Sequence, residues 1–343
     1  MLILFRNRVK RKNLVLFTLS VLAVFLASFS YKVKTVPSKN IVFTDKTIWF
    51  PGSIIKSDAI TGEIESVTIP LKRIGNLVVI EARIDNETGN FIFDTGSAEL
   101  VLNSTYFRKL FRIEEESGGI TGSSGAVERT IVKNIQIPGI NFRNITANVS
   151  NLGHLENRRG IKVLGLIGLS LFRNMEIIID FDRNELYLFS LDKAGNRIST
   201  KDPGYKPDLV QKIEVFNNVL FVKVNIAGKI LSFCLDTGAE SNVINSHAPK
   251  DVLRSITILQ RKNLMGVSKK ESEVLLCSVN NLSLGNKPMP GMNAIVADLH
   301  ELSAYYGYQI DGMLGFDFFI KGKVIINMKK KELKLCLNNP AGS

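Results

Sequence analysis

The chain has 343 residues, of which 45% are hydrophobic and 22% charged, and its formal net charge at neutral pH is +12. This composition excludes a disordered or fibrous protein, and the length suits two domains or one large all-β unit. Seven lysines and arginines and no acids lie within residues 1–34, so the remaining 309 residues carry only +5. They show no basic stripe of the kind that binds nucleic acid, so no nucleic-acid partner is expected.

Residues 1–31 are typical of a targeting segment. A basic stretch precedes residues 14–29, sixteen residues without a charge. A membrane span needs about 20 apolar residues and a signal-peptide core about 7–15. The small residues Ser28 and Ser30 are suitably placed for cleavage before Tyr31. We expect an extracytoplasmic protein, either anchored in the membrane by this helix or secreted (periplasmic) after cleavage, and favour the anchor.

Beyond the targeting segment, residues 32–75 have weak patterning and are interpreted as a juxtamembrane segment that either wraps the first lobe or forms a stalk. Residues 76–190 form the predicted first lobe and residues 213–339 the second. Between them, residues 191–212 are polar, contain two prolines and are typical of a linker.

The two lobes are copies of one domain. NLVVIEARIDNETGNFIFDTGSAELVLN at 76–103 aligns without a gap with NVLFVKVNIAGKILSFCLDTGAESNVIN at 218–245, an offset of 142 residues. Further on, VLGLIGLSLF at 163–172 aligns with IDGMLGFDFF at 310–319, and residues 175–188 align with 322–335, all at an offset of 147. The five-residue change therefore lies between the two blocks, where a variable loop is expected.

Each copy alternates short runs rich in Val, Ile, Phe and Leu with polar turns, which predicts strands at 77–84, 91–93, 177–181 and 185–189. Short turns are expected at Arg183–Asn184 and at Lys330–Lys331. A short helix is expected after Asn103 and after Asn245, since asparagine is a good N-cap. The predicted fold class is all-β with a few short helices.

Three cysteines (Cys234, Cys277, Cys336) are too few for a disulfide scaffold, although one bridge among them is possible. The three histidines lie far apart and fit no metal-ligand spacing, so no metal site and no cofactor are expected.

The repeated hydrophobic–hydrophobic–Asp-Thr-Gly segment points to chemistry. A buried strand delivers an aspartate to a tight turn, where a glycine lets backbone N–H groups donate to the carboxylate and the threonine hydroxyl can lock the turn to its partner. One such loop would be only a turn. Two copies related by a pseudo-two-fold axis can bring Asp94 and Asp236 together so that they share one proton. Such a pair can activate water for general acid–base hydrolysis of an amide.

FDTGS at 93–97, LDTGA at 235–239, LIG at 166–168 and MLG at 313–315 resemble the pepsin/retropepsin superfamily of aspartic peptidases, over roughly residues 75–336. The resemblance is to a fused, tandem retropepsin-like protein. It implies two duplicated, six-to-eight-stranded, barrel-like lobes related by a pseudo-two-fold axis. It also implies that each glycine element packs beneath an active-site loop, with Asp94 and Asp236 as the catalytic pair. The supporting loop residues are Thr95, Gly96, Ser97, Thr237, Gly238 and Ala239.

The family's flaps should lie at residues 118–130 (GGITGSSGAVERT) and 264–274 (LMGVSKKESEV), which gives as substrate-binding candidates Ile120, Thr121, Gly122, Ser123, Met265 and Gly266. The first flap lacks the tyrosine of pepsin-like flaps, and the second is charged, so the two are not expected to be equivalent. Ser97 matches the family residue that hydrogen-bonds the catalytic carboxylate, but its counterpart is Ala239. We leave open which aspartate holds the proton.

The sequence therefore predicts an aspartic endopeptidase acting on a peptide or protein substrate in a cleft between the lobes. Fused lobes make a dimer unnecessary, so a monomer is expected, with the membrane as a second partner through the N-terminal segment. The alternative is a catalytically silent module that binds peptides at the membrane surface. A purely structural envelope protein would not account for two polar Asp-Thr-Gly loops after buried strands.

Overall fold

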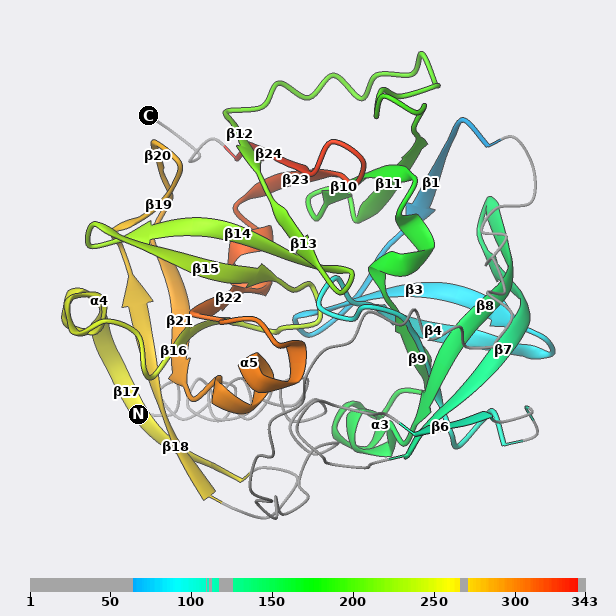
Figure 1. The fold of residues 1–343 in the computed structure, drawn as a ribbon, viewed down its shortest axis with the longest axis horizontal. Helices are drawn as coiled ribbons and strands as arrows, with labels where there is room; N and C mark the ends of the chain where they lie inside the picture. Colours follow the sequence, from blue (N-terminus) through cyan, green and yellow to red (C-terminus); the bar gives the residue numbers. More distant parts are fainter. Residues whose placement is uncertain (1–63, 109, 111–112, 117–125, 266–270, 339–343) are drawn as a thin grey trace, which may run out of the picture.

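The computed structural model describes residues 64–108, 110, 113–116, 126–265 and 271–338. Within these ranges the protein is built mostly from strands, in three sheets with a few short helices (Figure 1). No helix in this part of the chain is long and apolar enough to cross a membrane. The apolar stretch at 14–29 lies outside the described residues.

A six-stranded sheet joins the two halves of the chain and lies at the top of Figure 1. Its strands, in order, are β1 (Ser66–Pro70), β11 (Glu185–Ser190), β10 (Met175–Asp180), β23 (Gly322–Asn327), β24 (Glu332–Leu337) and β12 (Leu209–Lys212). At its centre β10 pairs antiparallel with β23, and Ile178 lies opposite Ile325. These residues are equivalent at the offset of 147, so the pseudo-two-fold axis passes through this pair.

Lobe one is an eight-stranded sheet. Its order is β2 (Lys72–Ile74), β3 (Leu77–Ile84), β4 (Glu87–Phe93), β9 (Val163–Ile167), β5 (Leu100–Asn103), β8 (Ile140–Ser150), β7 (Ala126–Ile137) and β6 (Ile113–Glu116). A further pairing joins β3 to β7, near the opposite ends of this order, and curls the sheet into a barrel. Strand β3 shows the reason for burial, because its apolar side chains are buried while Glu81 and Arg83 are exposed.

Lobe two repeats this order strand for strand. Its sheet runs β17 (Thr257–Met265), β18 (Glu271–Val279), β21 (Met292–Ala297), β16 (Asn242–Asn245), β22 (Gly312–Leu314), β15 (Lys229–Leu235), β14 (Val219–Ile226), β19 (Leu282–Leu284) and β20 (Lys287–Pro288), with β13 (Glu214–Phe216) on β14. These ten strands exceed the predicted six to eight, because the counterpart of the long strand β7 is divided into β18 and β19. The β14–β19 pairing repeats the barrel closure of lobe one.

The short helices also come in pairs. Helix α3 (Gly153–Arg159) and helix α5 (His300–Tyr306) are equivalent at the offset of 147, and each ends at a left-handed glycine, Gly160 or Gly307. A turn of 3-10 helix, η1 (Leu169–Phe172), matches α6 (Phe316–Phe319), and α4 (Lys250–Ser255) follows β16.

Neither asparagine predicted as an N-cap has that role. Residues 104–108 form turns, and α4 begins only after Pro249, which is its N-cap. Instead, Asn103 Nδ2 donates to Val163 O at 2.9 Å, and Asn245 Nδ2 donates to Ile310 O at 3.0 Å. Each asparagine therefore braces the end of one central strand against the segment that leads into the glycine element.

The hydrophobic core supports one cooperative unit, because its main cluster runs through both lobes and the shared sheet. The residues that deliver the aspartates, Phe93 and Leu235, are both fully buried. In lobe one, Phe172 makes edge-to-face contacts with Phe93 and Phe142, at ring-centroid distances of 5.9 and 5.8 Å. The tips of the two Asp-Thr-Gly loops are thus anchored in packed side chains.

The segment predicted as a linker is closely attached to the shared sheet. Its last residues form β12, and its remainder packs on β10 and β23 through side chains. Arg197 pairs with Glu176, which is 2% exposed, and Asn327 Nδ2 donates to Gly195 O at 3.0 Å. Farther along, Tyr205 Oη donates to Asp180 Oδ2 at 2.6 Å.

Candidate active site

Each candidate catalytic aspartate follows directly after a buried strand. Strand β4 ends at Phe93 and strand β15 at Leu235, so the next residue of each chain segment is Asp94 or Asp236. The backbone N–H of Asp94 donates to Ile167 O at 3.1 Å, and that of Asp236 donates to Leu314 O at 3.0 Å. Both side chains are buried, with exposed fractions of 0% and 3%.

The two loops are locked together by their threonines. Thr95 Oγ1 donates to Leu235 O at 2.8 Å and accepts the N–H of Thr237 at 2.9 Å. Reciprocally, Thr237 Oγ1 donates to Phe93 O at 2.7 Å and accepts the N–H of Thr95 at 3.0 Å. All four hydrogen bonds are buried and cross between the lobes, which fixes the position of one aspartate relative to the other.

Backbone N–H groups hold one oxygen of each carboxyl group. Gly96 and Ser97 donate to Asp94 Oδ1 at 2.9 and 3.1 Å. In lobe two, the N–H groups of Gly238 and Ala239 donate to Asp236 Oδ1 at 2.8 and 3.1 Å. The other oxygen of Asp94, Oδ2, is buried and has no hydrogen-bond partner among the described residues.

The glycines of the two loops show how closely the carboxyl groups approach the opposite lobe. A Cβ atom on Gly96 would lie 2.5 Å from Asp236 Cγ, and one on Gly238 would lie 2.7 Å from Asp94 Cγ. No side chain fits at such distances. Each carboxyl group therefore lies against the turn that carries the other, in a symmetric arrangement about the pseudo-two-fold axis.

This arrangement perturbs the acidity of both groups. Burial raises the pKa of Asp94 well above its ordinary value, and the neighbouring charge of Asp236 raises it further. Burial also raises the pKa of Asp236, against the lowering effects of the adjacent Asp94 side chain and of the N–H groups of Gly238 and Ala239. Two carboxyl groups in this environment share a proton, because ionising both would place two like charges side by side without water.

The glycine elements lie beneath the loops, as the resemblance implies. A Cβ on Gly168 would lie 2.4 Å from Ser97 O, and one on Gly315 would lie 2.6 Å from Ala239 O. Only glycine allows this approach of backbone to backbone. The elements thus support each active-site loop from below, on the side away from the carboxyl groups.

The loop residues Ser97 and Ala239 act through their backbones. Ser97 Oγ donates to Glu99 O at 2.9 Å and makes no hydrogen bond to the Asp94 carboxylate. The hydroxyl role that the resemblance implies for Ser97 is therefore not seen here. The carboxylate contact belongs to the N–H groups of both residues, which explains why alanine can occupy position 239.

Comparison with known families decides the classification. The family model described as aspartyl protease matches residues 80–171 and 222–318, which together make up more than half of the chain. The chain belongs to the aspartyl protease family. The two matched regions lie in the two lobes, as expected of a tandem retropepsin-like aspartyl protease. A search among curated proteins found no match.

Hairpins occupy both positions where this aspartyl protease was predicted to carry flaps. Strands β6 and β7 form the first, and β17 and β18 form the second, in which Met265 pairs with Glu271. Residues 120–123 and Gly266 lie outside the described residues. At the base of the first hairpin, Arg129 on β7 makes a two-pronged ion pair with Glu99, at 2.8 and 2.9 Å, and so joins the hairpin to the first active-site loop.

Two contacts between the lobes were missed by the sequence analysis. Tyr306 Oη, from α5, donates to Gly96 O at 2.9 Å, and Asn76 Nδ2 donates to Glu240 O at 2.9 Å. No motif marks Tyr306, because its equivalent in lobe one is Arg159. Asn76 aligns with Asn218, but that identity alone does not indicate a contact between lobes.

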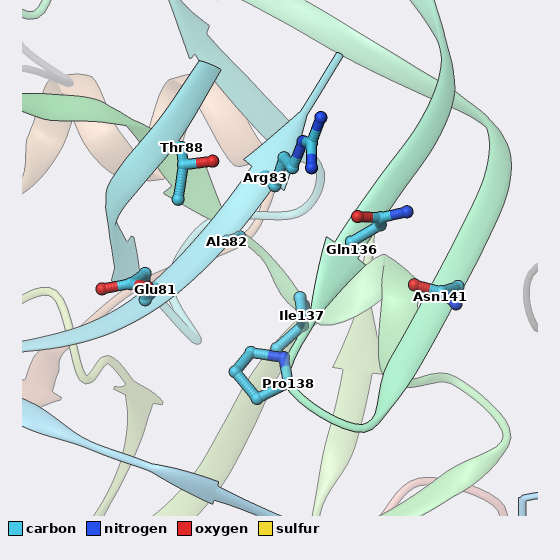
Figure 2. A pocket seen from close by; sticks show the side chains of 8 residues that line it. All are labelled: Glu81, Ala82, Arg83, Thr88, Gln136, Ile137, Pro138 and Asn141. Atoms are coloured by element: carbon cyan, nitrogen blue, oxygen red, sulfur yellow. The ribbon is translucent and has the colours of Figure 1, made fainter. Parts of the chain in front are cut away.

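Other features of the aspartyl protease lie apart from the carboxyl pair. All three cysteines are free and buried, and burial, then the charges of Asp236 and Asp94, raises the pKa of Cys234. No group of His, Cys, Asp or Glu in the described part of the chain could hold a metal ion. A shallow hollow of about 420 Å³ on lobe one, between the β3–β4 and β7–β8 hairpins, includes Arg83, Gln136 and Pro138 and contains none of the predicted site residues (Figure 2).

Proposed function

We propose that the chain is an aspartic endopeptidase that hydrolyses peptide bonds with a water molecule activated between Asp94 and Asp236. The observation that carries this proposal is the mutual approach of two buried carboxyl groups, each held by two N–H donors on a turn that the other lobe locks in place. Such a pair retains one proton over a range of pH in which isolated carboxyl groups are fully ionised.

The chemistry follows from that shared proton. The ionised carboxylate takes a proton from water as the water oxygen attacks the scissile carbonyl carbon, while the protonated carboxyl group donates its proton to the carbonyl oxygen. The resulting tetrahedral diol collapses when one hydroxyl returns its proton to a carboxylate and the amide nitrogen receives a proton. The C–N bond breaks, and the products are a carboxylic acid and an amine. No covalent intermediate with the enzyme is needed.

The substrate proposed is an extended peptide lying between the lobes. The hairpins β6–β7 and β17–β18 extend from the two lobes and offer strand edges with which a peptide main chain can pair. The buried and unpartnered Oδ2 of Asp94 is suited to the reacting groups, since its other oxygen is already engaged by Gly96 and Ser97. A monomer is proposed, because one chain supplies both aspartates.

Cleavage of a diverse peptide library tests this function. The full chain is incubated with the library from acid to neutral pH, and the products are identified by mass spectrometry beside those of Asp94→Asn. We expect cuts in the parent that the variant does not make. A folded parent that binds library peptides without cutting them at any pH would instead indicate a silent peptide-binding module.

We further propose that the basic and apolar residues 1–31 place the rest of the chain outside the cytoplasm, as a membrane anchor. The charge distribution supports this, because a positive flank precedes sixteen uncharged residues. Expression of the full chain followed by protease treatment of intact cells tests it. Protection of residues 32–343 from the external protease would contradict the proposal, and an N-terminus beginning at Tyr31 would indicate cleavage instead of anchoring.

A further inference from the structure

Tyr306 reaches from lobe two to the active-site loop of lobe one. It is the last residue of helix α5, its ring packs in a buried cluster with Ala239 and Met313, and it is 6% exposed. Partly buried Ala98, in the loop of lobe one, packs against the same cluster. From this fixed position the hydroxyl donates to Gly96 O at 2.9 Å.

The peptide that Tyr306 contacts is also the one that supports Asp94. The carbonyl group of Gly96 and the N–H of Ser97 belong to the same planar peptide unit. That N–H donates to Asp94 Oδ1 at 3.1 Å. Hydrogen bonds linked through one peptide polarise each other, so a donor at the carbonyl oxygen makes the N–H a stronger donor. Tyr306, the peptide and Asp94 therefore form a continuous chain of hydrogen bonds.

Lobe two does not repeat this chain. The corresponding peptide joins Gly238 to Ala239, and the helix position equivalent to Tyr306 is occupied by Arg159 in α3. The side chain that crosses from lobe one is Asn76, which donates to Glu240 O, two peptide units beyond the one that supports Asp236. The pseudo-two-fold symmetry of the carboxyl pair is thus broken in its supporting contacts.

We propose that Tyr306 is a positioning residue that orients and polarises the Gly96–Ser97 peptide, stabilises the ionised form of Asp94 and makes the two carboxyl groups unequal. The kinetic consequences of this role rest on the proposed function, whereas its effect on the ionisation of Asp94 does not. The other titratable groups around Asp94 are Asp236, the thiol of Cys234, and Glu99 and Glu240 in the adjoining loops.

Tyr306→Phe isolates the hydroxyl, because the ring can keep its packing in the buried cluster. The matched control is Tyr308→Phe, which removes a hydroxyl two residues away that contacts Glu214 and Ser232 and does not contact the loop. Carboxyl groups of both variants and of the parent are titrated by NMR after ¹³C labelling of aspartate, with the Asp94 signal assigned from Asp94→Asn. This readout needs no catalytic turnover.

We expect Tyr306→Phe to move the titration of Asp94 to higher pH by about 0.2–0.6 unit, the size that follows from weakening one hydrogen bond to a carboxylate by a tenth to a third. The pH–rate profile should show the same upward displacement of the limb that belongs to Asp94, and Tyr308→Phe should shift neither. An unchanged Asp94 titration in a folded Tyr306→Phe protein would overturn the proposal. So would a lower KM with an unchanged pH profile, which would mean that the hydroxyl competes with substrate for Gly96 O. A shifted titration in an inactive parent would refute the peptidase function alone.

Discussion

The threonine lock predicts a large loss of stability when one hydroxyl is removed. Thr95→Val keeps the approximate shape of the side chain but leaves two buried groups, Leu235 O and the N–H of Thr237, without the partner at 2.8 and 2.9 Å that Thr95 Oγ1 provides. A buried group that loses its hydrogen bond costs about 1–3 kcal/mol, so the two together predict a decrease of about 2–6 kcal/mol in the free energy of unfolding.

Thr95→Ser is the matched control, because it keeps the hydroxyl and removes only a methyl group. Burial of one methyl group contributes about 0.8 kcal/mol, so this variant should be destabilised by about 1 kcal/mol. Both free energies are obtained from equilibrium unfolding in urea of the full chain. One transition is expected, since the main core cluster runs through both lobes.

The difference between the two variants tests the reasoning directly. If Thr95→Val proves as stable as Thr95→Ser, the hydroxyl contributes nothing beyond its volume, and the lock between the lobes is not a source of stability. If both lose about 5 kcal/mol, the methyl group and its packing carry the effect instead of the hydrogen bonds.

Three further predictions concern the carboxyl pair and the shared sheet. Gly238→Ala should lower kcat/KM at least about 100-fold, because its Cβ would lie 2.7 Å from Asp94 Cγ and must displace that carboxyl group. Arg197→Ala should reduce the free energy of unfolding by about 3 kcal/mol, measured in urea, because it removes a partner of the buried Glu176; no change would contradict this. Burial raises the pKa of both Asp94 and Asp236, so the folded protein binds more protons than the unfolded chain above about pH 4, and its stability falls as the pH rises. Asp94→Asn should therefore make the fall in unfolding free energy between about pH 4 and pH 7 shallower, and an equally steep fall would refute that origin.

The internal repeat made much of the fold predictable. Gapless alignment of two Asp-Thr-Gly segments with their glycine elements implied two equivalent lobes, and the turns at Asn184 and Lys331 even share a left-handed backbone, with φ of 54° and 51°. The five-residue change of register falls where the hairpin of lobe two is extended and its long strand is divided into β18 and β19. Alternating apolar residues were enough to predict the strands of both copies.

What the sequence did not predict depends on contacts between distant segments. The shared six-stranded sheet uses β1 and β12, which lie in segments whose polar composition was typical of a stalk and a linker. The asparagines at 103 and 245 brace strands in place of capping helices, because partners at 163 and 310 compete for their amides. Tyr306 contacts Gly96 across 210 positions of sequence, and a pattern within one segment cannot indicate such a pair.

The central claim is that Asp94 and Asp236 act as one catalytic unit, and a double-variant comparison tests it most directly. Values of kcat/KM are measured on one cleaved peptide for the parent, Asp94→Asn, Asp236→Asn and the double variant. We expect each single substitution to lower kcat/KM by about 10³-fold or more and the double variant to be no worse than the singles, because either loss disables the shared proton. A single variant that keeps a substantial part of the parent's activity, or losses that multiply in the double variant, would contradict the account.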